Sequence, residues 1–189
     1  FLAEEDNKDL RYRKLEGYLY PDTYEFYVGE NASSVIRKFL DNFKGKWTDE
    51  YAAQAQKIGM SVDDVVTLAS IIEKEGYHQD EKPLIASVFL NRIAKNMRLQ
   101  SCATVEYLFD YKKQRLLDKD LWIESPYNTY RNKGLPPGPI SNPGEKSIEA
   151  AMNPAKTNYL YFVAGDDHRH TFSEEYKDHL KAKADLYSE

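Results

Sequence analysis

The sequence predicts an α+β domain in which several helices surround a small antiparallel sheet. Apolar residues recur at helical spacing in several separate stretches, and a continuous apolar and aromatic run at 159–164 precedes a Gly-Asp-Asp turn and a second short run at 168–172. Apolar residues three or four positions apart are typical of an amphipathic helix, and two short runs around a turn are typical of a hairpin. Together these patterns indicate helices packed around one hairpin.

The clearest helix is expected after Ser61. Ser61 and Asp64 have the spacing of a capping box, in which each side chain satisfies a free backbone N–H at the start of the helix. Apolar residues then follow on one helical face, at Val65, Leu68, Ala69 and Ile72. Earlier in the chain, helices are predicted after Ser33 or Ser34 and after Thr48, and the aromatic segment 24–28 is predicted to be a strand.

The second half of the chain predicts a helix, a long irregular segment and the hairpin. Asp80 and Pro83 open the helix, and residues 97–143 are rich in Tyr, Asn, Pro and Gly, which is typical of a functional loop. A short helix capped by Asn142 is expected to run to Met152. After the hairpin, Ser173 is predicted to cap a final amphipathic helix.

Composition excludes several classes of function. The 189 residues are 41% hydrophobic, which suffices for a core, and the net charge of -5 gives no basic stripe for nucleic acid. One cysteine excludes a disulfide framework, and there is no apolar run of roughly 18 residues that could span a membrane. Because the chain begins without Met and within a predicted charged helix at 3–14, we expect further segments to precede it.

Glu73 is the candidate acid. At about 100° per residue, it follows Ala69 by one turn and Val66 by two, so it lies on the flank of the apolar stripe while Lys74 points away. We expect burial to disfavour its carboxylate and to raise its pKa, as a general acid at neutral pH requires. Glu75 falls on the other flank of the stripe.

Periodicity alone leaves another interpretation of Glu73 open. The side chain could form an ion pair with Arg92 or Arg98, or be exposed at the helix edge. A metal site is not predicted, although His168 and His170 alternate on one predicted strand, because no carboxylate stands at matching spacing. Phosphate loops and nucleophile elbows are also missing from the sequence, so no cofactor is expected.

Seven segments in order along the chain resemble the YceG-like (MltG) endolytic murein transglycosylases. The first two are LEGYLYPDTY at 15–24 and ASIIEKE at 69–75, which resembles the helix that bears the family's catalytic Glu. The others are SVFLNR at 87–92, MRLQ at 97–100, SPYNTY at 125–130, GLPPGPI at 134–140 and YLYFVA at 159–164. One departure concerns Cys102, which stands where the family pattern has an acid.

The resemblance implies a helical catalytic domain with a lysozyme-like helix carrying the acid. Residues 1–16 would be the end of an N-terminal LysM-like module or a linker, and 17–189 the catalytic domain. It also implies a protein anchored in the cell membrane, with this domain outside the cytoplasm. Its partners would be peptidoglycan glycan strands and the cell-wall synthesis machinery.

The function implied is cleavage of the bond between N-acetylmuramic acid and N-acetylglucosamine, with Glu73 as the single acid and base and a 1,6-anhydro product. Loop and cleft side chains would orient the glycan; we expect these to be Asn91, Gln100, Tyr127, Asn128, Thr129, Tyr130 and His170. Two alternatives stay open at this point, a hydrolytic muramidase and a wall-binding module without activity.

Overall fold

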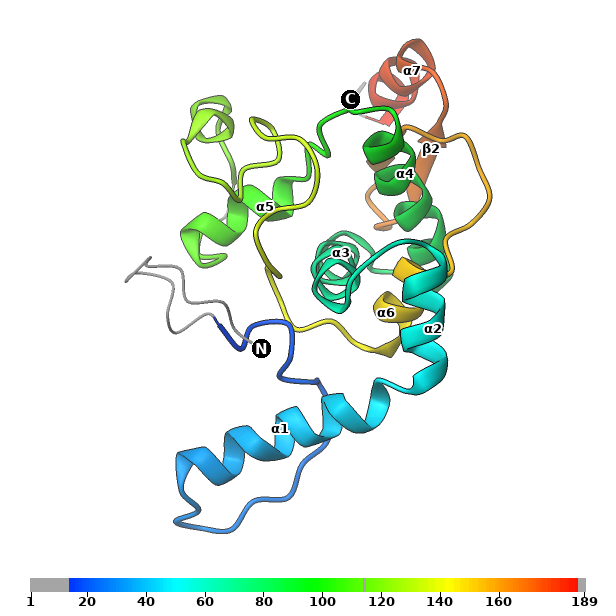
Figure 1. Ribbon diagram of the computed structural model, residues 1–189. Helices are drawn as coiled ribbons and strands as arrows, with labels where there is room; N and C mark the ends of the chain where they lie inside the picture. The colour runs from blue at the N-terminus through cyan, green and yellow to red at the C-terminus, as the bar shows by residue number, and fades with distance from the viewer. Residues whose placement is uncertain (1–13, 114, 187–189) are drawn as a thin grey trace.

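The computed structural model describes residues 14–113 and 115–186 and is mostly helical with one two-stranded antiparallel sheet (Figure 1). The predicted α+β class is therefore confirmed. The predicted helix at 3–14 lies almost wholly outside the described residues. In chain order the elements are α1 (Ala32–Lys46), α2 (Asp49–Lys57), α3 (Val62–Glu75), η2 (Gln79–Glu81), α4 (Lys82–Ala94), α5 (Cys102–Glu106), η3 (Tyr107–Phe109), η4 (Asp118–Trp122), α6 (Glu145–Met152), β1 (Tyr161–Ala164), β2 (His170–Ser173) and α7 (Tyr176–Leu186).

Helix α3 is the centre of the fold. It begins with the predicted capping box of Ser61 and Asp64 and ends at Gly76, and its residues 65–72 are all buried. A helix buried on all sides needs partners around it, and α3 packs against α6, α4, α5 and α2. Figure 1 shows α3 nearly end-on, with α4, α6 and α2 on one side and the segment around α5 on the other.

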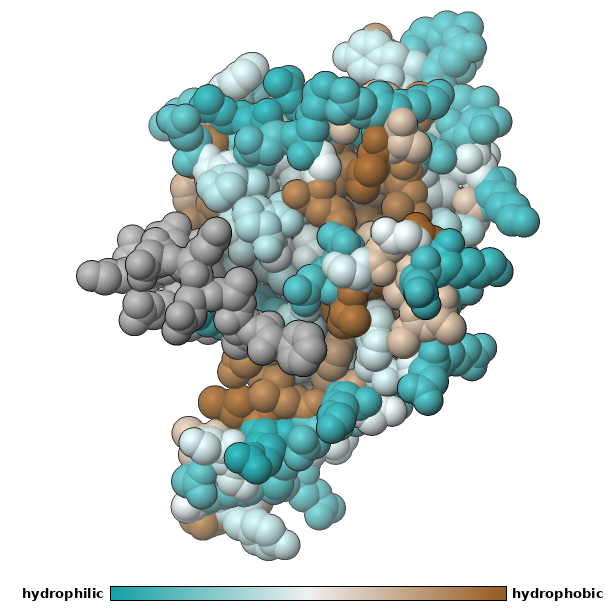
Figure 2. Space-filling model, in the orientation of Figure 1, coloured by the Kyte–Doolittle hydropathy of each residue, from teal (hydrophilic) through white to brown (hydrophobic). Residues whose placement is uncertain are grey.

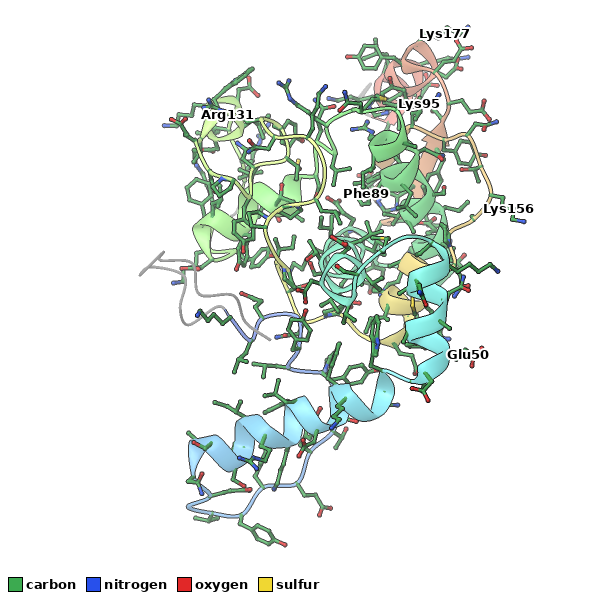
Figure 3. All side chains as sticks on the ribbon, viewed as in Figure 1. Glu50, Phe89, Lys95, Arg131, Lys156 and Lys177 are labelled. Carbon is green, nitrogen blue, oxygen red and sulfur yellow. The ribbon has the colours of Figure 1, made fainter. Side chains whose placement is uncertain are left out.

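The hairpin is attached to the core through α4. Strands β1 and β2 pair with Tyr161 opposite Ser173 and Ala164 opposite His170, and α7 packs against both strands. The ring of Phe162 meets the buried Phe89 of α4 edge-on, with 5.8 Å between centroids. Figure 3 shows Phe89 on the side of α4 that faces the interior. The predicted hairpin is confirmed, although Ser173 ends β2 and α7 begins three residues later.

Helix α1 projects away from the helices around α3 (Figure 1). The segment at 24–28 that precedes it is irregular and ends in a turn, so the strand predicted there is wrong. Strand propensity needs a neighbouring strand, and in the described residues only β1 and β2 pair. Tyr24 instead packs on Phe39 of α1 with 4.4 Å between centroids. Hydrophobic side chains remain visible on the side of α1 that faces the rest of the molecule (Figure 2).

The irregular segment 97–143 folds back across α3. It contains α5, η3 and η4, and it returns to the core where Ser70 Oγ accepts a hydrogen bond from the backbone N–H of Ile140, at 2.9 Å. The prediction that Asn142 caps α6 is wrong, because the N-cap of α6 is Gly144. Its side chain instead accepts the backbone N–H of Gly17 at 2.7 Å, so the segment at 15–19 is tied to the same strip of loop.

Across the two ranges that the structure describes, none of the helices has the length and apolar character needed to cross a lipid bilayer.

Candidate active site

The last turn of α3 presents two carboxylates, Glu73 and Glu75. Because residues two apart on a helix point about 200° away from each other, they face different neighbours. Glu73 faces α4 and α6, whereas Glu75 faces the segment that leads into α5. The site is therefore two separate environments on one helix end.

Glu73 lies in a cluster of donors. Its Oε2 accepts hydrogen bonds from Lys82 Nζ at 3.0 Å, Ser147 Oγ at 2.5 Å and the backbone N–H of Gly144 at 3.3 Å. Burial raises the pKa of Glu73, but the bonds from Ser147 and Lys82 and the charge of Lys82 outweigh it, so the pKa lies below its ordinary value. The expected rise in the pKa of Glu73 is therefore wrong, and its ion-pair partner is Lys82.

Lys82 gives this cluster a structural role. Its side chain is 8% exposed, and its Nζ also donates to Ser147 Oγ at 2.9 Å. Lys82 is the first residue of α4 and Ser147 lies in the first turn of α6. Glu73 thus joins three helices, and its carboxylate supplies the negative charge that compensates a nearly buried ammonium.

Glu75 has the opposite character. Its Oε1 accepts a hydrogen bond from Ser101 Oγ at 2.5 Å, and the backbone N–H of Ala103 donates to it as well. Burial raises the pKa of Glu75, and these two bonds and the charge of His170 offset only part of the rise. Of the two carboxyls, Glu75 is therefore the one whose pKa lies above its ordinary value.

Gln100 lies directly before the serine that binds Glu75, and its backbone is strained. Its φ of 52° is in the left-handed region, which non-glycine residues seldom adopt. The surrounding structure holds it there: its N–H donates to Thr129 O at 3.1 Å, and Arg92 Nη1 donates to its side-chain oxygen at 3.3 Å. Gln100 is exposed, and its predicted contact with the glycan stays a prediction.

Cys102 and Tyr130 meet close to Glu75. The Cys102 sulfur and the Tyr130 hydroxyl lie 3.1 Å apart, and burial raises the pKa of both groups. The negative charge of Glu75 acts in the same direction on each. The position where the family pattern has an acid is therefore occupied here by a thiol that stays neutral next to the Glu75 carboxyl.

The other predicted ligand-facing residues divide into two groups. Asn128 is fully buried, and its amide donates to Leu121 O at 3.0 Å and Ile123 O at 2.8 Å. Thr129, 1% exposed, accepts from the backbone N–H of Ser101. Both side chains therefore hold the loop, and the direct glycan contacts predicted for Asn128 and Thr129 stay a prediction that their burial argues against.

Asn91 and Tyr127 are partly exposed but also committed to packing. The Asn91 amide donates to Thr157 O at 2.9 Å and Tyr159 O at 3.0 Å, which attaches the segment before β1 to α4. The Tyr127 ring packs on Tyr107 with 5.1 Å between centroids. Both side chains are therefore engaged in contacts within the fold.

The histidines do not form a metal centre. Within the described residues, no three His, Cys, Asp or Glu side chains are grouped so that they could hold an ion. His170 hydrogen-bonds Glu81 through Nδ1 at 2.8 Å, His78 contacts the carbonyl of Asp167, and the ring of His179 stacks on Tyr161.

Sequence reasoning missed Lys82, Ser147 and Glu81. Each of these polar residues is nearly buried, and their partners lie on other elements. One signal was present: Lys82 and Glu81 are charged residues at the start of a helix whose following turns are apolar. Their partners could not be read from the spacing, since Ser147 and His170 lie far along the chain.

The structure is thus a mostly helical α+β domain whose central helix ends in two carboxyls, one with a lowered and one with a raised pKa. The sequence model of the YceG-like family matches residues 2–185, and the chain belongs to this family.

Individual proteins of known name are also similar to this chain. An endolytic murein transglycosylase of Bacillus subtilis strain 168 is 44% identical over 177 residues, which cover 94% of this chain and 49% of the relative. One of Streptococcus pneumoniae serotype 2 strain D39 is 38% identical over 159 residues, 82% of this chain and 28% of the relative. The crystal structure of a yceG-like protein from Listeria monocytogenes superposes with a TM-score of 0.82 at 45% identity, over 89% of this chain and 54% of that one. The chain thus spans about half the length of the first relative.

Proposed function

We propose that this domain is the catalytic part of an endolytic peptidoglycan lytic transglycosylase. Family membership and the activity named for two relatives support the reaction class. The observation that carries the proposal is the environment of Glu75, a carboxyl at the end of the central helix whose pKa is raised by burial. The substrate would be the glycan strand, cleaved between N-acetylmuramic acid and N-acetylglucosamine.

The proton donor in this proposal is Glu75 rather than Glu73. A general acid must carry its proton at neutral pH, and the surroundings of Glu75 favour the protonated form. Glu73 is held as a carboxylate by Lys82, and its donors leave it no proton to give. The assignment of Glu73 as the acid, which the resemblance of segment 69–75 implies, is a prediction that the contacts of Lys82 and Ser147 argue against.

The reaction needs one carboxyl in two roles. Glu75 gives its proton to the glycosidic oxygen as the bond from C1 of the muramic residue to that oxygen breaks. The resulting carboxylate then takes the proton of the C6 hydroxyl, whose oxygen bonds to C1 and closes the 1,6-anhydro ring. The proton lost in the first step is regained in the second, and no water is consumed.

The exposed side of this acid would meet the sugar. Gln100 is held in a strained backbone conformation beside Ser101, and such strain is often kept where a ligand is bound. We propose that Gln100 and Tyr130 orient the muramic residue. Since its substrate lies outside the cytoplasmic membrane, we further propose that the whole protein acts there, with cell-wall synthesis enzymes as partners.

The product distinguishes this proposal from hydrolysis. Sacculi or uncrosslinked strands are digested with the domain, and the new muramic ends are compared by mass with those from a hydrolytic muramidase. We expect anhydro ends, about 18 Da lighter because water never attacks. Reducing ends would contradict transglycosylation and would make Glu106, whose charge acts on Glu75, the candidate second carboxylate. Absence of any cleavage would favour a binding module.

A further inference from the structure

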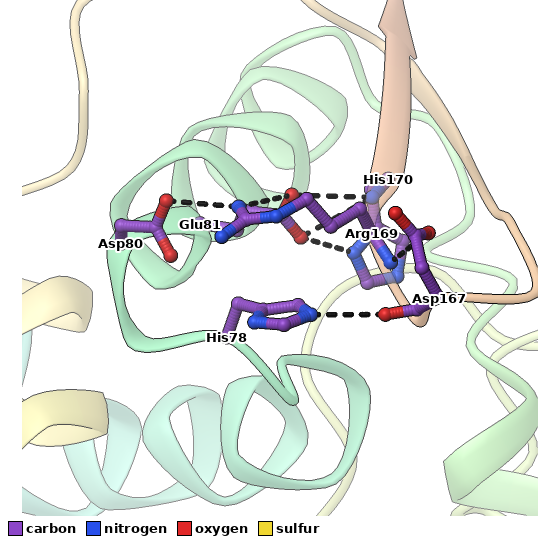
Figure 4. Close-up of polar contacts among 6 residues, drawn as sticks. All are labelled: His78, Asp80, Glu81, Asp167, Arg169 and His170. Carbon is purple, nitrogen blue, oxygen red and sulfur yellow. Dashed lines mark hydrogen bonds and ion pairs between the residues drawn. The ribbon is translucent and has the colours of Figure 1, made fainter.

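A buried pair of side chains, Glu81 and His170, lies apart from the contacts that hold either carboxyl of α3. Glu81 comes from the turn before α4 and His170 from the first position of β2. Their side chains are 7% and 4% exposed, and His170 Nδ1 lies 2.8 Å from Glu81 Oε2. Figure 4 shows the two side chains facing each other, with Arg169 across the same carboxylate.

The carboxylate of Glu81 orients the ring of His170. Besides Nδ1, it accepts the backbone N–H of His170 at 3.2 Å and Arg169 Nη1 at 3.3 Å, and the same Nη1 also donates to Asp80 at 2.9 Å. A carboxylate with several donors around it accepts hydrogen bonds, so Nδ1 carries the proton and Nε2 is the nitrogen that can bind a further one.

The rest of the ring is enclosed by aromatic side chains. Phe162 meets the ring edge-on with 5.1 Å between centroids, and Phe172 lies at 6.0 Å. Within the described residues, Nε2 has no hydrogen-bond partner, yet it is not among the fully buried unpartnered atoms. The imidazole is therefore held by one carboxylate and two aromatic rings, and among the described residues only its Nδ1 has a hydrogen-bond partner.

His170 is within electrostatic range of Glu75. Among the groups that face Glu75, His170 of β2 favours its carboxylate, together with Ser101 and the Ala103 N–H from the α5 side. Glu106 of α5 opposes it, and Cys102 and Tyr130 face it as neutral groups. His170 is thus the group in this set that can become a cation.

We propose that the Glu81–His170 pair is a positioning device that sets the charge of Glu75 during the reaction. This inference rests on the proposed function, in which Glu75 alternates between acid and carboxylate. When Glu75 has given up its proton, a protonated His170 stabilises the carboxylate until the C6 hydroxyl returns one. Glu81 keeps the imidazole in place through its bond to Nδ1.

The test follows the titration of Glu75 itself. The protein is labelled with carbon-13 at its Glu side-chain carboxyls, and the Glu75 signal is assigned by its loss in Glu75→Gln. His170→Asn keeps an amide donor near the position of Nδ1, so the bond to Glu81 can persist while the titrating ring is removed. His168→Asn is the matched control, because His168 is exposed on the same hairpin and its φ of 60° suits Asn.

We expect the titration midpoint of Glu75 to move upward in His170→Asn and to stay in place in His168→Asn. The basic limb of the pH profile of glycan cleavage should move upward with it. An unchanged Glu75 midpoint in a folded His170→Asn protein would overturn the inference, as would an equal shift in both variants. The proposed function fails separately, by the wild-type product, because the titration needs no substrate.

Discussion

Glu73 and Glu75 are two residues apart on one helix, yet they have opposite surroundings. Glu73 has a nearly buried ammonium, a hydroxyl and a backbone N–H, which together lower its pKa. Glu75 has one hydroxyl and one backbone N–H, and burial prevails. A carboxylate whose charge is balanced by a nearby cation stabilises the fold. A general acid instead needs surroundings that leave its negative charge only partly balanced, so that it keeps its proton.

Glu73→Gln should have the largest effect on stability. The substitution keeps the shape but leaves Lys82 nearly buried without its counter-charge, so we expect a loss of about 2 kcal/mol, reduced from that of a fully buried pair because Glu73 is 33% exposed. Urea unfolding measures this. Glu124→Gln is the control, since that side chain is 91% exposed and should change little.

The loss should depend on pH. Because the folded-state pKa of Glu73 is lowered, its contribution is present above the unfolded-state pKa and disappears as pH falls through the folded-state value. The gap between wild type and Glu73→Gln should therefore narrow in acid. A gap of the same size at every pH would show that the pair with Lys82 is not its cause.

Glu75→Gln should have a smaller effect on stability, with the opposite sign. The folded-state pKa of Glu75 is raised, so at neutral pH folding must bury a carboxyl that is ionised in the unfolded chain, which costs stability. A neutral amide has no such cost, and we expect Glu75→Gln to gain about 1 kcal/mol. The gain should shrink as pH falls through the folded-state pKa and vanish below the unfolded-state pKa, where Glu75 is protonated in both states. A clear loss of stability in Glu75→Gln at neutral pH would contradict this contrast, because Glu75 would then stabilise the fold as Glu73 does.

The sequence predicted the scaffold better than the chemistry of its site. The capping box at Ser61 and the apolar face of α3 are local signals, and the helix was confirmed with both. Whether Glu73 or Glu75 has the raised pKa depends on Lys82 and Ser147, which α4 and α6 bring to one side of α3. Periodicity gives the face on which a side chain lies, but not the groups that meet it.

The loop residues show the same limit. Segment 125–130, chosen from the resemblance, contains Tyr130, which contacts Cys102 and is within range of the charge of Glu75. The resemblance could not separate the residues that face outward from those that hold the loop. Asn128 is of the second kind, because its amide satisfies two carbonyls that burial would otherwise leave unpaired.

The most direct test of the account compares glycan cleavage by Glu75→Gln and Glu73→Gln. The two variants make the same isosteric change on one helix, and rates are measured on purified glycan strands at a temperature where both are folded. We predict that Glu75→Gln lowers the rate by about 10²–10⁴-fold, as expected when a general acid is removed, while Glu73→Gln keeps most of it. A strong loss in Glu73→Gln together with near wild-type cleavage by Glu75→Gln would contradict the assignment of Glu75 as the acid.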